Sequence, residues 1–194
     1  MQKKYSTKTV CTALVVAMSA LSAAPAFADA PSGPRVEAMV GVDSTLLNDK
    51  TYGTGRTTIT GFYYGGGLGY DFALSPNFSL GIDGELASAT SREPASAGLG
   101  RLGAGRDLYA GLRGTFVVAR DTNLYVKLGY ASGTFKIING SNAIYSGNNN
   151  NFRVGVGIQQ NFSKNIYGFA EYRYSAPLDS LSRNQVVTGL GIRF

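Results

Sequence analysis

Apolar and polar residues alternate along eight separate stretches of this chain, and this pattern constrains its fold more than any other feature. Successive side chains of a β-strand point to opposite faces, so the alternation predicts strands with one apolar face and one polar or small face. The 26 glycines and 12 tyrosines also suit strands and tight turns. The eight stretches run from Val36 to Asp43, Phe62 to Phe72, Phe78 to Leu86, Leu108 to Val118, Leu124 to Ala131, Phe152 to Gln159, Ile166 to Tyr174 and Val186 to Phe194. The seventh is the least regular.

The connections between these stretches alternate between short and long. Short turns are predicted at Ala73 to Asn77, Arg120 to Thr122 and Ser163 to Asn165, and longer segments at Ser44 to Thr57, Ser88 to Gly105, Ile138 to Asn150 and Ala176 to Arg183. Such alternation across an even number of antiparallel strands is typical of outer-membrane barrels, which have short periplasmic turns and long extracellular loops. We therefore predict an all-β fold, an eight-stranded antiparallel up-and-down transmembrane β-barrel with both termini in the periplasm.

The aromatic residues of the apolar faces distinguish this barrel from a soluble sandwich, which would also alternate. Once the strand directions are assigned, these residues fall into two bands, as expected for rings at the two membrane interfaces. A soluble core would not predict two bands. The periplasmic band contains Tyr70, Phe72, Phe78, Phe116, Phe162 and Phe194, and the outer band contains Phe62, Tyr64, Tyr130, Phe152, Tyr172 and Tyr174.

The N-terminal segment has the features of a secretory signal peptide. Three lysines precede an apolar stretch from Ala13 to Ala24, and Ala26 and Ala28 form a small-x-small cleavage site. We expect a signal peptide over residues 1–28, a short lead-in over 29–34 and the barrel domain over 35–194. The one cysteine, Cys11, lies in the signal segment, so the predicted mature chain has no disulfide and no thiol nucleophile.

Three motifs carry a resemblance to a known family. They are the segments Gly61 to Phe72, Gly168 to Tyr174 and Gly189 to Phe194. On these motifs the chain resembles the small OmpA-like or OmpX-like barrels of Gram-negative bacteria, the porin-family group with an outer membrane protein β-barrel domain. The resemblance covers Pro34 to Phe194 and implies localisation in the outer membrane.

The resemblance also implies an assembly signal in the last strand. In such proteins the barrel assembly machinery recognises a C-terminal pattern of a polar residue, glycine, an apolar residue and a final aromatic residue. Gly189, Ile192 and Phe194 match this pattern, whereas Val187 stands in place of the polar residue. The assembly machinery is therefore an expected partner of this chain.

Charged residues on the polar faces are predicted to point into the barrel. Asp83 and Glu85, two residues apart on one face, could serve as an acid and a base or as a cation site. A salt-bridged network that satisfies buried charges is the favoured interpretation, because four basic residues share the same interior. OmpA-like barrels carry an interior ion-pair network that plugs the lumen and acts as a gate, and the resemblance implies the same here. The candidate residues are Glu37, Asp83, Glu85, Arg113, Lys127, Arg153, Glu171 and Arg173.

Catalysis has little support in this sequence. The chain has no histidine, which excludes a Ser-His-Asp triad and a metal site with imidazole ligands. A hydrolase that uses carboxylates alone is the remaining enzymatic alternative. The glycine-rich runs Gly65 to Gly69 and Gly98 to Gly103 have no predicted helix to bind phosphate. We expect no catalytic residue, no cofactor and no metal. Inward glycines instead fit a narrow barrel, which needs small residues beside large ones.

The expected partners are lipids. The net charge of +6 includes the three signal-segment lysines and shows no clustering of a nucleic-acid site. Arg56, Arg92, Arg101 and Lys136 are candidates to meet lipopolysaccharide phosphates. The Asn-, Ser- and Gly-rich loops are interpreted as solvated caps, with a recognition surface as the alternative.

Three functions remain after this reasoning. The first is a monomeric structural barrel that stabilises the envelope, with weak pore formation through a lumen plugged by ion pairs. The second is a narrow gated porin for ions and small solutes. The third is a surface adhesion or binding module that acts through the extracellular loops.

Overall fold

Every regular element in the described part of the chain is a β-strand. The computed structural model describes residues 29–47, 57–89, 101–139, 142–177 and 181–194. Among these residues, no helix is long and apolar enough to cross a membrane. The strands are β1 (Gly33–Leu47), β2 (Thr57–Ser75), β3 (Phe78–Ala89), β4 (Arg101–Ala119), β5 (Thr122–Asn139), β6 (Asn142–Asn161), β7 (Ile166–Pro177) and β8 (Leu181–Arg193).

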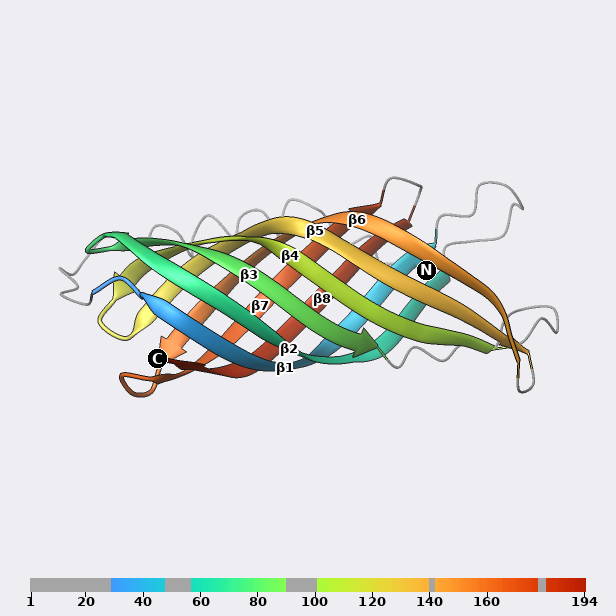
Figure 1. The fold of residues 1–194 in the computed structure, drawn as a ribbon, viewed down its shortest axis with the longest axis horizontal. Coiled ribbons are helices and arrows are strands. Elements are labelled where there is room, and N and C mark those ends of the chain that lie inside the picture. The colour runs from blue at the N-terminus through green and yellow to red at the C-terminus, as the bar shows by residue number, and fades with distance from the viewer. Residues whose placement is uncertain (1–28, 48–56, 90–100, 140–141, 178–180) are drawn as a thin grey trace, which may run out of the picture.

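The eight strands form one closed antiparallel barrel in which each strand pairs with its neighbours in sequence and β8 pairs with β1 (Figure 1). The strands are strongly staggered. Stepping from partner to partner around the barrel, starting at Arg35 on β1, leads back to β1 at Thr45. Such a stagger requires the strands to tilt relative to the barrel axis. The predicted fold class is confirmed.

The short turns lie together at one end of the barrel, beside the C-terminus (Figure 1). At this end the seam between β1 and β8 is closed by main-chain contacts, since the Phe194 amide donates to the Pro34 carbonyl at 3.0 Å. Gly33 adopts a φ of 97°, and a side chain there would collide with the Phe194 carbonyl. The side-chain amide of Asn165, in the last turn, donates to the Arg193 carbonyl at 2.7 Å. The first and last strands are thus joined where the short turns lie.

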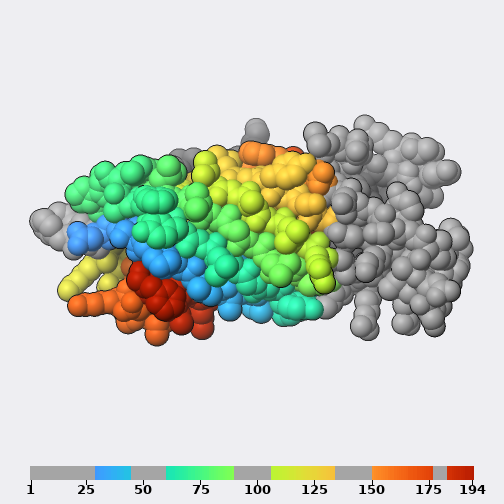
Figure 2. All heavy atoms as spheres, viewed as in Figure 1, coloured from blue at the N-terminus to red at the C-terminus, as the bar shows by residue number. Residues whose placement is uncertain are grey.

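The outer face of the barrel is apolar and the inner face is polar, which inverts the usual arrangement of a water-soluble protein. Large apolar side chains cover the wall, and Leu68 on β2 is 67% exposed. The space-filling view shows this wall as a continuous convex surface of side chains (Figure 2). The described residues of the eight stretches follow the predicted alternation with two exceptions. Gly168, predicted to face outward, is buried beside the Phe162 ring, and the alternation is lost at Val117 and Val118, where the register shifts. Phe169 points inward and is buried, as predicted. Such a face fits a lipid environment.

Aromatic side chains gather on the outer wall near the turns. The Tyr70 and Phe72 rings lie with centroids 4.7 Å apart, and so do the Phe78 and Phe116 rings. All four belong to the predicted periplasmic band. Three of them are among the exposed large hydrophobic residues, and Phe78 is half-buried. This placement matches amphipathic and aromatic rings at a membrane interface.

The strands are longer than predicted at the end opposite the turns. The prediction of a loop from Ile138 to Asn150 is wrong, because β5 and β6 stay paired out to Asn139 and Asn142. β4 also begins at Arg101, inside another predicted loop, and pairs with β5 from that residue. Outside the membrane both faces of a strand are exposed to water. The strands therefore stay paired there without the alternation of apolar and polar residues from which a strand is predicted. β1 likewise begins at Gly33, inside the segment predicted as a lead-in.

Candidate functional site

The interior of the barrel is filled by charged side chains. All eight candidate residues predicted to face inward are buried there, so their predicted placement is confirmed. Each lies on the inner face because the strand pleat alternates and the opposite face carries the apolar wall. Arg113 and Arg173 are only 1% exposed. The interior is therefore the candidate functional site.

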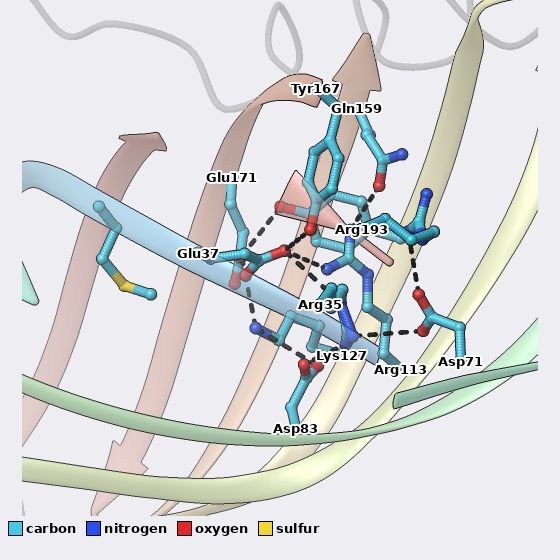
Figure 3. Close-up of polar contacts among 12 residues, drawn as sticks. Arg35, Glu37, Asp71, Asp83, Arg113, Lys127, Gln159, Tyr167, Glu171 and Arg193 are labelled. Carbon is cyan, nitrogen blue, oxygen red and sulfur yellow. Dashed lines mark hydrogen bonds and ion pairs between the residues drawn. The ribbon is translucent and has the colours of Figure 1, made fainter. Parts of the chain in front are cut away.

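Glu37 on β1 and Arg113 on β4 form one ion pair across the lumen (Figure 3). Arg113 Nη1 donates to Glu37 Oε1 at 2.8 Å, and the Tyr167 hydroxyl donates to the same oxygen at 2.8 Å. The Arg113 guanidinium also donates to Gln159 Oε1 at 3.0 Å and lies 3.8 Å from the centre of the Tyr125 ring. Residues of β5, β6 and β7 thus contact the pair that Glu37 of β1 forms with Arg113 of β4.

Arg35 lies beside this pair, toward the turn end, and contacts three carboxylates. Its guanidinium pairs with Asp83 in a short contact, with Asp71 at 3.3 Å and with Glu37 at 3.6 Å. Asp71 is shared with Arg193 on the last strand, whose Nη2 lies 3.0 Å from Asp71 Oδ2. Figure 3 shows these side chains pointing toward one another from β1, β2, β3 and β8. The chain of ion pairs therefore reaches the turn end.

Lys127 and Arg173 form the other half of this cluster. Lys127 pairs with Glu85 in a short contact and lies 3.4 Å from Asp83 and 3.9 Å from Glu171. Arg173 bridges two of the same carboxylates, with Nη1 at 2.7 Å from Glu85 and Nε at 2.7 Å from Glu171. Because carboxylates are shared between cations, the pairs form one connected cluster. We call it the central network: Arg35, Glu37, Asp71, Asp83, Glu85, Arg113, Lys127, Glu171, Arg173 and Arg193.

A second cluster lies toward the end of the barrel opposite the short turns. Arg153 Nη2 lies 2.7 Å from Asp107 Oδ2, and its Nε donates to the Ser175 hydroxyl at 3.2 Å. Arg183 lies 2.8 Å from Asp107 and 2.5 Å from Asp43, which ties β8 to β4 and β1. We call this cluster the loop-end network: Asp43, Asp107, Arg153 and Arg183.

The two networks leave every described interior charge with an opposite partner. Together they contain seven carboxylates and seven cations. Asp83 and Glu85 each contact basic groups, an arrangement that favours a structural role over acid-base work or cation binding. Among the described residues, no group of three or more His, Cys, Asp or Glu side chains could hold a metal ion.

Glycines on the inner face make room for the aromatic rings of this interior. A side chain at Gly157 would collide with the Tyr125 ring, and one at Gly191 would collide with the Tyr167 ring. These are the rings that contact Arg113 and Glu37, so the glycines hold them at the network. The prediction that small inward residues lie beside large ones is confirmed at these positions.

Six charged members of the networks were missed as site residues. Asp43, Asp71 and Arg193 lie on faces already predicted to point inward, so the alternation itself could have included them. Arg35 directly precedes the first alternating stretch and could have been found by extending it. Asp107 directly precedes the fourth stretch and could have been found in the same way, whereas Arg183 lies at the end of a predicted loop. These six are Arg35, Asp43, Asp71, Asp107, Arg183 and Arg193.

The remaining predicted positions are placed as follows. Ile192 and Phe194 face outward, and Phe194 is 72% exposed, while Gly189 lies beside the Phe169 ring. Their recognition by the assembly machinery stays a prediction. The signal segment with Ala26 and Ala28 lies outside the described residues, as do Arg56 and Arg92. The Arg101 and Lys136 backbones lie in strands, but their side chains are outside the description.

Solved outer-membrane barrels are similar to this chain in fold. Ail, the attachment invasion locus protein of Yersinia pestis, shares 19% identity over 84% of this chain and 100% of its own, with a TM-score of 0.57. Neisserial surface protein A shares 14% identity over 84% of this chain and 98% of its own, with a TM-score of 0.62. The N-terminal barrel domain of Pseudomonas aeruginosa OprF shares 16% identity over 80% of this chain and 97% of its own, with a TM-score of 0.52.

A search of curated proteins gives no match to this sequence. The family comparison is decisive, because the model of the outer membrane protein beta-barrel domain matches residues 13–194. That match includes all eight strands and both interior networks. The chain belongs to the outer membrane protein beta-barrel domain family.

Proposed function

We propose that this protein is a structural barrel of the outer membrane whose lumen is closed by its own ion pairs. The observation that supports this role is the filled, charge-balanced interior, where Arg113 and Arg173 are almost fully buried. Opening a path would separate buried charges from their partners, which is costly in a low-dielectric interior. The closed state is therefore the resting state, and the barrel wall contributes to the envelope by spanning it.

Planar-bilayer recording tests this proposal. The refolded protein is expected to show no reproducible single-channel steps, because the central network fills the lumen. Glu85→Gln is the matched comparison, since it keeps the side chain's size and removes the charge that Lys127 and Arg173 share. Reproducible steps in the unmodified protein that change with Glu85→Gln would instead support the gated-porin function.

The orientation in the membrane is also a proposal. The short turns and the C-terminus lie at one end of the barrel, and β1, β3, β5 and β7 end at the other. In outer-membrane barrels the short turns are periplasmic. We place the turn end in the periplasm, with the aromatic band of Tyr70, Phe72, Phe78 and Phe116 at the inner interface.

A second candidate function is surface binding, favoured by the extension of β4, β5 and β6. β3 pairs with β4 only as far as Arg106, and β7 pairs with β6 only as far as Asn151. Beyond these points the three strands continue as a sheet whose two outer edges have no neighbouring strand among the described residues. The extension contains basic Arg101 and Lys136, and the chain has no acidic residue between Asp121 and Glu171. A basic extracellular sheet suits a sulfated or phosphorylated polyanion, including lipopolysaccharide.

Shortening the extension tests surface binding. A variant that lacks residues 134–148 joins Gly133 to Asn149 as the two central residues of a new hairpin turn, and it keeps the β5–β6 pairs from Ser132 and Asn150 into the barrel. We expect its binding to a heparin-coated surface to fall by about ten-fold or more, equivalent to about 1.4 kcal/mol. The control is an unchanged heat-dependent shift in electrophoretic mobility, which reports a folded barrel. Undiminished heparin binding by the folded variant would remove this candidate function.

A further inference from the structure

The two interior networks are distinct sets of ion pairs. Among the described residues, no ion pair joins a member of the central network to a member of the loop-end network. The central network has five carboxylates and five cations, and the loop-end network has two of each. Each network is therefore neutral by itself, and neither needs a charge from the other to satisfy its members.

Two tyrosine rings lie at the boundary between the networks. The Tyr63 ring centre is 5.9 Å from the guanidinium of Arg173, in the central network, and 5.9 Å from that of Arg183, in the loop-end network. The Tyr109 ring centre is 5.4 Å from Lys127 Nζ and 5.5 Å from the Arg153 guanidinium. Each ring thus contacts one cation from each side, and both rings are buried. Cation–π contacts of this length are weak beside buried ion pairs, so they permit one network to rearrange without the other.

The networks also differ in how solvent reaches them. The Arg183 side chain is 19% exposed at the loop end, whereas the Arg173 side chain is 1% exposed. At the other end, the Arg193 side chain is 12% exposed beside buried Asp71. A solute that enters from the external medium therefore reaches the loop-end network first. A solute that enters from the periplasm reaches the central network first.

We propose that the lumen contains two gates in series, the loop-end network and the central network, which open independently. This inference rests on the proposed function, in which ion pairs close the lumen. Opening the loop-end gate admits solvent only as far as Tyr63 and Tyr109. Opening the central gate admits solvent only from the turn end. Ions cross the barrel only when both gates are open, so the unmodified protein conducts less than either gate alone would allow.

Charge-balanced pair deletions test the series arrangement. Asp43→Ala with Arg183→Ala removes one loop-end pair and leaves Arg153 paired with Asp107. Asp107→Ala with Arg153→Ala removes the other pair and provides a second variant if the first fails to fold. Electrophoretic mobility before and after heating reports folding for every variant.

The central gate is opened by Glu85→Ala with Arg173→Ala. This deletion also removes equal and opposite charges, and it leaves Lys127 with Asp83 and Glu171. We expect neither gate's pair deletion alone to produce reproducible single-channel steps in a planar bilayer. The variant that combines one loop-end deletion with the central deletion is expected to produce them.

A cysteine between the networks reports which gate is open. Ala131 is buried on the inner face, opposite Tyr109 on the neighbouring strand. In a Cys11→Ser background, which removes the one other thiol, Ala131→Cys is expected to react slowly with a charged methanethiosulfonate reagent. The loop-end deletion should raise its labelling rate by about ten-fold or more, as for a local opening made easier by about 1.4 kcal/mol, without conductance.

Three outcomes would overturn the inference. These are full conductance from one pair deletion alone, absence of steps from the folded combined variant, and labelling of Ala131→Cys that the loop-end deletion leaves unchanged. Conductance by the unmodified protein is a different result, because it contradicts the proposed closed lumen itself. Failure of the series arrangement and failure of the closed barrel are therefore distinguishable in one set of recordings.

Discussion

Arg173→Ala is expected to destabilise the barrel by about 3–5 kcal/mol, the usual cost of removing one partner from a buried ion pair. Arg173 lies 2.7 Å from both Glu85 and Glu171, and its loss leaves these carboxylates with Lys127 as their remaining central cation. The measurement is the free energy of unfolding in urea for protein refolded into lipid bilayers.

Two comparisons separate loss of charge balance from loss of volume. Arg120→Ala removes an exposed arginine at a turn and should change the free energy of unfolding by about 0.5 kcal/mol or less. The pair variant Arg173→Met with Glu85→Leu keeps the volume and the balance, and should cost less than Arg173→Met alone. If Arg173→Ala costs no more than Arg120→Ala, the central network does not stabilise the fold.

Leu68→Arg is expected to cost about 2–4 kcal/mol, the penalty for arginine on the lipid face at the bilayer midplane. Leu68 is 67% exposed on the outer wall of β2, between the outward aromatic residues Tyr64 and Tyr70. On a soluble barrel the same exposed substitution would change stability little. The experiment compares the free energy of unfolding with and without the substitution in bilayers.

Leu74→Arg is the matched control for Leu68→Arg. Leu74 is 62% exposed on β2, two residues beyond Phe72, at the turn end. Near the interface an arginine costs about 0–1 kcal/mol, because its side chain can reach the headgroups and water. Equal costs at the two positions would contradict the assignment of Leu68 to the middle of the membrane.

Alternation predicted the faces of all eight strands because the membrane imposes a chemical difference between them. Lipid requires Leu68 and its neighbours outside, and the narrow lumen requires glycine or a paired charge inside. Alternation does not predict the strand pairing from Ile138 to Asn150, where β5 and β6 leave the membrane and pairing no longer depends on an apolar face. A strand in this region has no alternation of apolar and polar residues from which it could be predicted.

The pairing of the interior charges could not be predicted from alternation. Glu37 meets Arg113 three strands away, and Arg183 meets both Asp43 and Asp107. These partners depend on the stagger of the strands around the barrel, which a single sequence does not reveal. Whether a side chain points inward follows from the sequence of its own strand. Which ion-pair partner it meets depends on how all eight strands are aligned in the closed barrel.

The separate neutrality of the two networks has a consequence for how this sequence can change over evolutionary time. A carboxylate such as Glu85 has cations from two other strands, so its loss can be offset by a second substitution at Lys127 or at Arg173. Selection then acts on the charge sum of each network and less on the residue at any one position. Interior positions of related barrels should therefore vary in compensated sets within a network, while positions in different networks drift independently.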